Sequence, residues 1–146
     1  MSEKPTNKNE LTEQGSPDKV VIERKLPLTA IDIESQKDMK ARRYHSLRSL
    51  HKWFAARPTP ASRLSVLGSV LPAEVDDDEL LKLMQIGPKE LRSGRAEYVE
   101  RKFSEPKGSG GLDDHYGYPN PNTQSPTSSE LEQLHEQVAE AWGGEL

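Results

Sequence analysis

The sequence of 146 residues contains no cysteine, few aromatic residues and no long apolar run. The absence of cysteine excludes disulfides and cysteine-based zinc sites. No apolar stretch approaches the ~20 residues that a membrane-spanning helix needs, and the first residues lack the apolar region of a signal peptide. We therefore expect a cytoplasmic protein with no membrane partner.

The apolar content is also low, at 32% hydrophobic and 5% aromatic residues, with 11 prolines. The length suits one domain, but so few apolar side chains predict a small core. Segments without them cannot offset the roughly 1–2 kcal/mol of backbone entropy that each ordered residue loses. We expect short helices separated by long disordered segments.

Positive and negative charges are distributed unevenly along the chain, although the net charge is only −4. Eight cations between Lys37 and Arg63 face a single acid, Asp38, and no Lys or Arg follows Lys107. This asymmetry indicates a local anion-binding surface rather than a basic protein. The eight cations are Lys37, Lys40, Arg42, Arg43, Arg48, Lys52, Arg57 and Arg63.

Helix caps and apolar spacing predict a mainly α fold. Most of the expected helices begin at a Thr or Asp that can accept a hydrogen bond from the first turn, and carry apolar residues three or four positions apart. The nearest approach to a strand, residues 19–26, has no partner strand. Helices are expected to start at Thr29, near His45, at Thr59, at Asp76 and at Thr127, with a further one over Glu90–Phe103.

Three of these helices have features that can be checked individually. The helix after Thr59 carries the most apolar face in the chain, which ends at Leu71 and is the best candidate for the core. The helix capped by Asp76 is expected to end at Gly87, and the one capped by Thr127 at Gly143.

The domain organisation follows from composition. We expect a disordered leader over 1–19, a helical segment over 20–103, a flexible linker over 104–126 and a final helix over 127–146. The linker is expected because this stretch is rich in Gly, Pro, Ser and Asn.

The stretch HSLRSLHKWFAARPTPASRL, residues 45–64, combines cations with aromatic side chains. Its cations could neutralise phosphates, and an exposed Trp could stack on a base. Alternatively, Trp53 and Phe54 belong to the core and the cations form an ordinary solvated face. The candidate nucleic-acid-binding residues are Arg42, Arg43, Arg48, Lys52, Trp53, Arg57 and Arg63.

No catalytic, cofactor-binding or metal-binding residues are assigned. The two histidines of this stretch, His45 and His51, have no carboxylate or nucleophile at a helical spacing that would build a catalytic group.

Residues Arg24–Pro72 resemble the opening segment of the adenine-specific DNA methylases whose N-terminus is catalogued as domain of unknown function eleven fifty-six. Leu-Pro-Leu is followed by a helix, a histidine and the motif Trp-Phe-Ala-Ala-Arg-Pro, which ends at Pro58. The family has a Trp-Trp-Ala-Arg-Arg-Pro-like motif. Phe54 therefore replaces a Trp and Ala56 replaces an Arg, which removes one of two adjacent cations.

The resemblance implies an incomplete N-terminal part of an α/β DNA adenine methyltransferase of a restriction-modification or phage-defence system. The sequence contains neither an Asp-Pro-x-x-Gly-x-Gly loop for S-adenosylmethionine nor an Asn-Pro-Pro-Tyr-type motif for a flipped base. Whether the chain counts as an enzyme is therefore left open, and we expect it to be inactive alone. S-adenosylmethionine is implied for a full-length enzyme, with DNA and the remainder of a methyltransferase as partners.

Two alternatives stay open beside this hypothesis. One is a small helical DNA-binding or regulatory protein that uses the same cations. The other is a gene remnant without function.

Overall fold

The computed structural model describes residues 17–41, 59–108, 115–121 and 124–144. Within these ranges the chain forms five α-helices and no strand, and an isolated antiparallel bridge joins Val20 to Pro72. The predicted mainly α fold of short helices is confirmed. None of these described helices combines the length and apolar character needed to cross a membrane. In chain order the elements are the 3-10 helix η1 (Val21–Glu23), then α1 (Leu28–Ala41), α3 (Thr59–Val70), α4 (Asp77–Leu83), α5 (Arg95–Ser104) and α7 (Ser128–Ala141).

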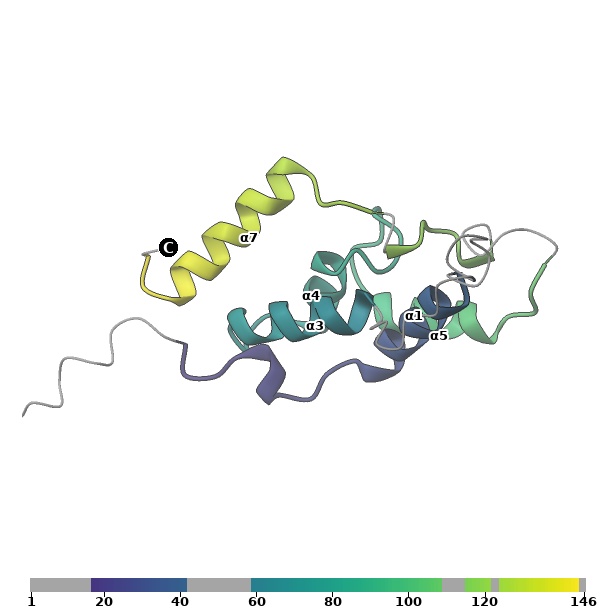
Figure 1. The fold of residues 1–146 in the computed structure, drawn as a ribbon, viewed down its shortest axis with the longest axis horizontal. Coiled ribbons are helices and arrows are strands. Elements are labelled where there is room, and N and C mark those ends of the chain that lie inside the picture. Colours follow the sequence, from purple (N-terminus) through teal and green to yellow (C-terminus); the bar gives the residue numbers. More distant parts are fainter. Residues whose placement is uncertain (1–16, 42–58, 109–114, 122–123, 145–146) are drawn as a thin grey trace, which may run out of the picture.

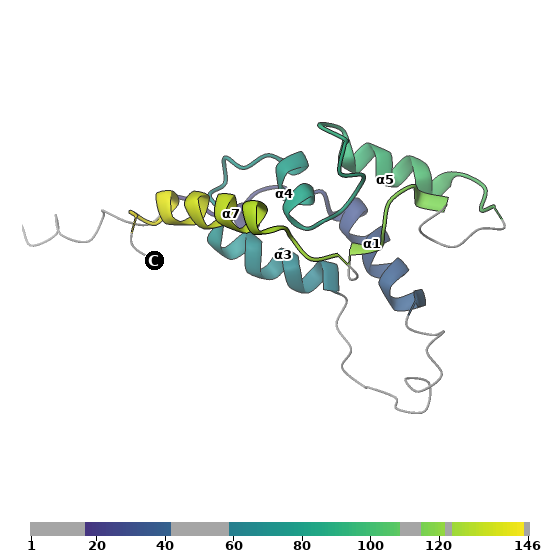
Figure 2. The same ribbon diagram turned by 90° about the horizontal axis from the view of Figure 1, so that it is seen from above.

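Helix α1 lies beside α3 and α5 and contacts both (Figure 2). The short helix η1 packs on α3, and α4 packs on α5. Helix α7 runs along the opposite edge of the molecule from α1 and α5 (Figure 1). The region before α1 joins the same unit, because the Lys19 carbonyl accepts a 3.0 Å hydrogen bond from the Ala73 N–H. Of the expected leader, residues 1–16 lie outside the described part of the chain.

One core joins the elements around α1. The face of α3 that the sequence singled out contributes to it, because Leu71 is fully buried and Leu64, Leu67 and Val70 pack partly against it. The buried apolar residues are Val21, Ala30, Ile31, Ile33, Leu71, Val75, Leu80, Leu81, Met84, Ile86, Val99, Tyr116 and Tyr118.

Helix α1 begins at Leu28, one residue before the predicted start. The Pro27 carbonyl accepts a hydrogen bond from the Ile31 N–H, at 3.3 Å, so Thr29 lies inside the helix rather than at its cap. Ile31 points into the core, since this side chain is 5% exposed. The helix expected near His45 lies outside the described residues.

Helix α4 starts as predicted and ends earlier. Asp76 caps it by accepting a 2.7 Å hydrogen bond from the Glu79 N–H. The prediction that the helix continues to Gly87 is wrong, because it ends at Leu83. Gln85 adopts a left-handed conformation with φ 61°, and its N–H and that of the next residue bond back to α4 carbonyls at 2.9 and 2.8 Å. This Schellman turn closes the helix without a glycine.

Helix α5 starts at Arg95 instead of Glu90. The carboxylate of Asp78, in α4, accepts hydrogen bonds of 2.9 Å from the N–H groups of both Gly94 and Arg95. These N–H groups belong to the helix end that has no partner within its own helix. Because the cap comes from another helix, no local signal marks this start.

Part of the expected linker over 104–126 belongs to the core. Tyr116 and Tyr118 are 1% and 3% exposed, and Asn120 is also buried. The expectation that this stretch cannot bury enough surface to be ordered is therefore wrong for residues 115–121. The Gly and Pro content of this stretch indicated a loop. Its two tyrosines nevertheless bury a large apolar area, which the low apolar content of the stretch did not predict.

The predicted ends of α7 are confirmed. Thr127 and Glu130 form a capping box, in which the Glu130 N–H donates to Thr127 Oγ1 and the Thr127 N–H donates to the Glu130 carboxylate. Gly143 follows the helix in the left-handed region, with φ 85°.

Candidate nucleic-acid interface and its buried support

One of the seven residues predicted to contact nucleic acid lies in the described part of the chain. This residue is Arg63, in α3. The other six lie outside the described residues: Arg42, Arg43, Arg48, Lys52, Trp53 and Arg57. The structure therefore describes the two helices that flank their segment in the sequence, α1 and α3.

The guanidinium of Arg63 binds two backbone carbonyls. Its Nη1 donates to the Met84 carbonyl at 2.9 Å, and its Nη2 donates to the Gln124 carbonyl at 3.2 Å. Met84 is the C-cap of α4, so Arg63 satisfies a carbonyl near a helix end. Burial lowers the pKa of Arg63, and the negative charge of Asp38 partly opposes this. Arg63 thus joins α3 to α4 and to the chain before α7, and its contact with DNA stays a prediction.

The segment 42–58 leaves α1 and returns to α3, two helices that contact each other. Asp38 is fully buried in the last turn of α1, and its Oδ2 accepts a 3.0 Å hydrogen bond from the Thr59 N–H at the start of α3. A carboxylate at a helix N-terminus satisfies a free N–H and interacts favourably with the helix dipole. The segment carries five Lys or Arg residues and no Asp or Glu. These five cations lie in the sequence between two helices that the Asp38–Thr59 bond joins.

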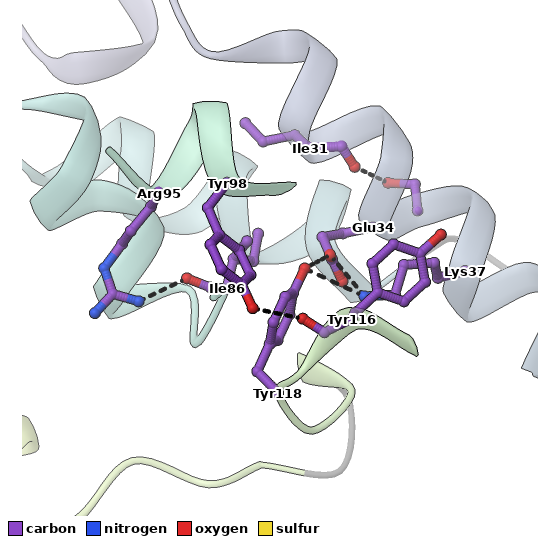
Figure 3. A network of polar contacts seen from close by, with 9 residues as sticks. Ile31, Glu34, Lys37, Ile86, Arg95, Tyr98, Tyr116 and Tyr118 are labelled. Atoms are coloured by element: carbon purple, nitrogen blue, oxygen red, sulfur yellow. Dashed lines mark hydrogen bonds and ion pairs between the residues drawn. The ribbon is translucent and has the colours of Figure 1, made fainter. Parts of the chain in front are cut away.

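Directly before Asp38, α1 carries a buried ion pair between Glu34 and Lys37 (Figure 3). Lys37 Nζ lies 2.8 Å from Glu34 Oε1, and the two side chains are 3% and 0% exposed. The Tyr118 hydroxyl donates to the same carboxylate oxygen and accepts from Lys37 Nζ at 3.2 Å. Buried charges are tolerated when they are paired and hydrogen-bonded. The Lys37 ammonium, the Glu34 carboxylate and the Tyr118 hydroxyl therefore each need the other two as buried partners.

Aromatic rings surround the Lys37 ammonium. Its Nζ lies 3.8 Å from the centroid of the Tyr116 ring and 4.4 Å from that of Tyr118, which are cation–π distances. The Tyr98 hydroxyl, from α5, donates to the Tyr116 carbonyl at 3.0 Å (Figure 3). Burial, reinforced by the Glu34 carboxylate, raises the pKa of both Tyr116 and Tyr118. The cluster fixes α1 against α5 and residues 115–121.

Lys37 does not belong to the basic surface that the charge distribution indicated. It is 2% exposed, and its charge faces Glu34 and the two tyrosine rings. Sequence reasoning missed this cluster altogether. The one local signal for it is the pair Glu34 and Lys37 at i,i+3 on a helix, a spacing at which side chains meet.

Within the described ranges, no three His, Asp or Glu side chains are grouped so that they could hold a metal ion. Glu34 Oε2 is shielded from solvent and has no hydrogen-bond partner, whereas Oε1 has two. The cluster therefore packs α1, the helix that precedes the basic segment in the sequence, against α5 and residues 115–121.

Residues 25–92 match the profile of a family described as a protein of unknown function (DUF1156). This range includes α1, α3 and α4 and the basic segment between α1 and α3. The predicted resemblance to that domain, over Arg24–Pro72, is confirmed from residue 25 onward, and the match extends to residue 92. No curated protein and no solved structure matches the chain.

Proposed function

We propose that this chain contributes DNA contact to an adenine-specific DNA methyltransferase through the cations of segment 42–58. The observation that carries the proposal is the hydrogen bond between Asp38 and Thr59, which joins the helices that precede and follow that segment. A segment with cations and no carboxylates, attached at a single place, concentrates positive potential there. Duplex DNA, with its regular phosphate charges, is the polyanion that such a surface fits.

The chemical roles within the segment differ. Arg42, Arg43, Arg48, Lys52 and Arg57 neutralise phosphates, which provides affinity without sequence preference. Trp53 offers a ring on which an unstacked base can lie. Methyl transfer to adenine acts on a base taken out of the stack, so an aromatic side chain beside the cations suits such an enzyme.

The methyl-transfer chemistry itself requires residues that this sequence does not contain. It has no glycine-rich loop of the type that binds S-adenosylmethionine and no motif of the type that holds the flipped base. We therefore expect the chain alone neither to bind S-adenosylmethionine nor to methylate DNA. Isothermal titration that gives micromolar binding of S-adenosylmethionine to the chain alone would contradict this expectation.

A second candidate function is a small DNA-binding or regulatory protein. The observation that favours it is the core shared by η1, α1, α3, α4 and α5, which is formed by the chain's own residues. Both functions use the basic segment, and they differ in their need for a methyltransferase partner. If the chain co-purifies with a protein that methylates DNA and needs S-adenosylmethionine, this supports the methyltransferase function and not the small DNA-binding or regulatory protein.

Binding of a fluorescent DNA duplex, followed by anisotropy at low salt, tests the shared claim. The test variant replaces the five Lys and Arg residues of 42–58 by Gln, and we expect it to lose binding. The control variant removes the same charge from five exposed cations elsewhere and should retain most of the affinity. Equal loss in both variants would mean that net charge alone, rather than this segment, binds DNA. The control positions are Lys82, Lys89, Arg92, Arg101 and Lys107.

A further inference from the structure

A small pocket of about 40 Å³ lies where α4, the start of α5 and the start of α7 meet. This volume has room for about three water molecules, and therefore for the oxygen atoms of one small anion. The charged residues that line the pocket are Lys82 of α4, Lys89, Arg95 of α5 and Glu130 of α7. Three cations and one carboxylate leave the pocket with a surplus of two positive charges.

Arg95 is the buried cation of this pocket, at 2% exposed. Its guanidinium donates to two neutral acceptors, the carbonyls of Ile86 at 2.9 Å (Figure 3) and of Leu91 at 2.7 Å. Within the described part of the chain, no carboxylate forms an ion pair with it. Burial lowers the pKa of Arg95, and the charges of Asp78 and Glu90 only partly oppose this. A buried charge of this kind is costly until an opposite charge pairs with it.

Gly87 leaves space beside the guanidinium. It lines the same pocket and lies in the left-handed region, with φ 93°. A Cβ atom at this position would lie 3.1 Å from Arg95 Nη1, which is closer than an ordinary van der Waals contact. A guanidinium carries five N–H donors, and the two carbonyl bonds use only part of this capacity. An acceptor oxygen can therefore approach Nη1 where a side chain would otherwise lie.

Lys82 and Lys89 supply two exposed cations to the pocket. Neither ammonium forms a hydrogen bond or ion pair with any described residue. The Glu130 carboxylate is instead engaged in the cap of α7, where it accepts from the Thr127 N–H at 2.7 Å and from Thr127 Oγ1 at 3.0 Å. The hydrogen bond from Thr127 lowers the pKa of Glu130, and the charges of Lys89 and Lys82 lower it further. Both lysines thus lie near this carboxylate and keep their donors available.

We propose that this pocket is a binding site for a single phosphate group, either free phosphate or the terminal phosphate of a monoester. A phosphate monoester carries a charge of about −1.5 to −2 at pH 7 and three acceptor oxygens, which matches the surplus of two positive charges. Arg95 supplies a planar donor pair, and the two lysines supply mobile ammonium groups. The inference uses no residue of segment 42–58 and does not rest on the proposed DNA contact.

The test is a titration of the full chain with inorganic phosphate at constant ionic strength, followed by the amide NMR signals of Gly87 and Arg95. We expect saturable shifts of both signals. Lys82→Gln with Lys89→Gln should weaken binding at least about tenfold, because two charge-assisted hydrogen bonds are lost. Arg92→Gln with Lys107→Gln is the matched control, since it removes two exposed cations that do not line the pocket.

Glu130→Gln gives an expectation of the opposite sign. Glutamine at this position of a capping box also accepts from the N-cap, so α7 should keep its start. The substitution removes a negative charge from the pocket and should tighten phosphate binding by about two- to fivefold. A variant that merely loosens the fold would not bind more tightly.

Thymidine 5′-monophosphate and thymidine distinguish the two sources of the phosphate group. Binding of the monophosphate but not of thymidine assigns the pocket to a monoester, and binding of inorganic phosphate alone assigns it to free phosphate. No saturable shift at Gly87 and Arg95 with either phosphate, in a chain that circular dichroism shows to be folded, would overturn the proposal. Equal weakening by the control pair, or weaker binding by Glu130→Gln, would do the same. Equal shifts with acetate would show an adventitious ion only.

Discussion

Asp38 and Thr59 are 21 positions apart in the sequence and are joined by a 3.0 Å hydrogen bond from the Thr59 N–H to Asp38 Oδ2. The bond connects the last turn of α1 to the first turn of α3. It therefore joins the two helices between which the segment with five cations and no carboxylate lies in the sequence. Its contribution to stability and the contribution of those cations to binding can be measured separately.

Replacing Asp38 by Ala should destabilise the chain by about 1–3 kcal/mol, because the Thr59 N–H loses its buried acceptor. Arg63 also loses the nearby negative charge that favours its protonated form. Urea unfolding followed by circular dichroism measures the change. Asp32→Ala is the control on the same helix, because its carboxylate is exposed and, among the described residues, is bonded only to the Gln36 side chain. Equal destabilisation by both substitutions would contradict the anchoring role of Asp38.

The buried ion pair predicts a non-additive pair of substitutions. Lys37→Met leaves the Glu34 carboxylate buried without its cation and should cost about 3–5 kcal/mol. The double variant Glu34→Met with Lys37→Met removes both charges and should recover much of that loss. Chemical unfolding of both single variants and the double variant at neutral pH gives the coupling. Additive losses would show that the two charges are not a mutually dependent pair.

Tyr118 should make the stability depend on pH in the alkaline range. Its pKa is raised in the folded state, mainly by burial and also by Glu34. The folded chain therefore keeps the phenolic proton above about pH 10, where an unfolded chain releases it. The slope of stability against pH is then negative, so stability is fully present below about pH 10 and is lost as pH rises beyond it.

Tyr118→Phe should reduce this alkaline loss by up to about 1.4 kcal/mol per pH unit. It should also cost about 1–3 kcal/mol at neutral pH, because Glu34 loses a buried hydrogen-bond donor. Urea unfolding at several pH values up to 11 measures both effects. A variant whose slope above pH 10 equals that of the wild type would contradict the burial of this hydroxyl.

Asp78 should matter more than its neighbour Asp77. Asp78→Ala removes the acceptor for two N–H groups at the start of α5, and the loss of such a cap costs about 1–2 kcal/mol. Asp77 pairs with Arg24, but its side chain is 47% exposed, so Asp77→Ala should cost about 0–1 kcal/mol. Thermal unfolding of the two variants ranks them. The reverse order would contradict the capping of α5 by α4.

Sequence patterns located the helix starts whose partners are close in the chain. Each of these caps joins two residues that are three positions apart, Asp76 with Glu79 and Thr127 with Glu130. Such a cap can be recognised in the sequence as a local motif. The start of α5 was not predictable in this way, because its cap, Asp78, is 17 positions before Arg95. Only the packing of α4 on α5 brings the two together.

The same limit applies to the candidate site. Composition identified the cations of 42–58, but it grouped Lys37 with them. The burial of Lys37 depends on Tyr118, which is 81 positions away in a stretch whose Gly and Pro content indicates a loop. Single-residue polarity cannot show that a lysine is enclosed by aromatic rings from such a distant segment.

The most direct test of the DNA contact is the salt dependence of duplex binding. The logarithm of the binding constant should fall linearly with the logarithm of salt concentration, by about 0.9 for each phosphate neutralised. The variant Arg48→Ala with Lys52→Ala should reduce the magnitude of this slope by about 2, since each phosphate contact accounts for about one unit. The control Lys89→Ala with Arg92→Ala, at two exposed positions outside the segment, should leave the slope unchanged. A slope that is the same in the wild type and in Arg48→Ala with Lys52→Ala would contradict the account.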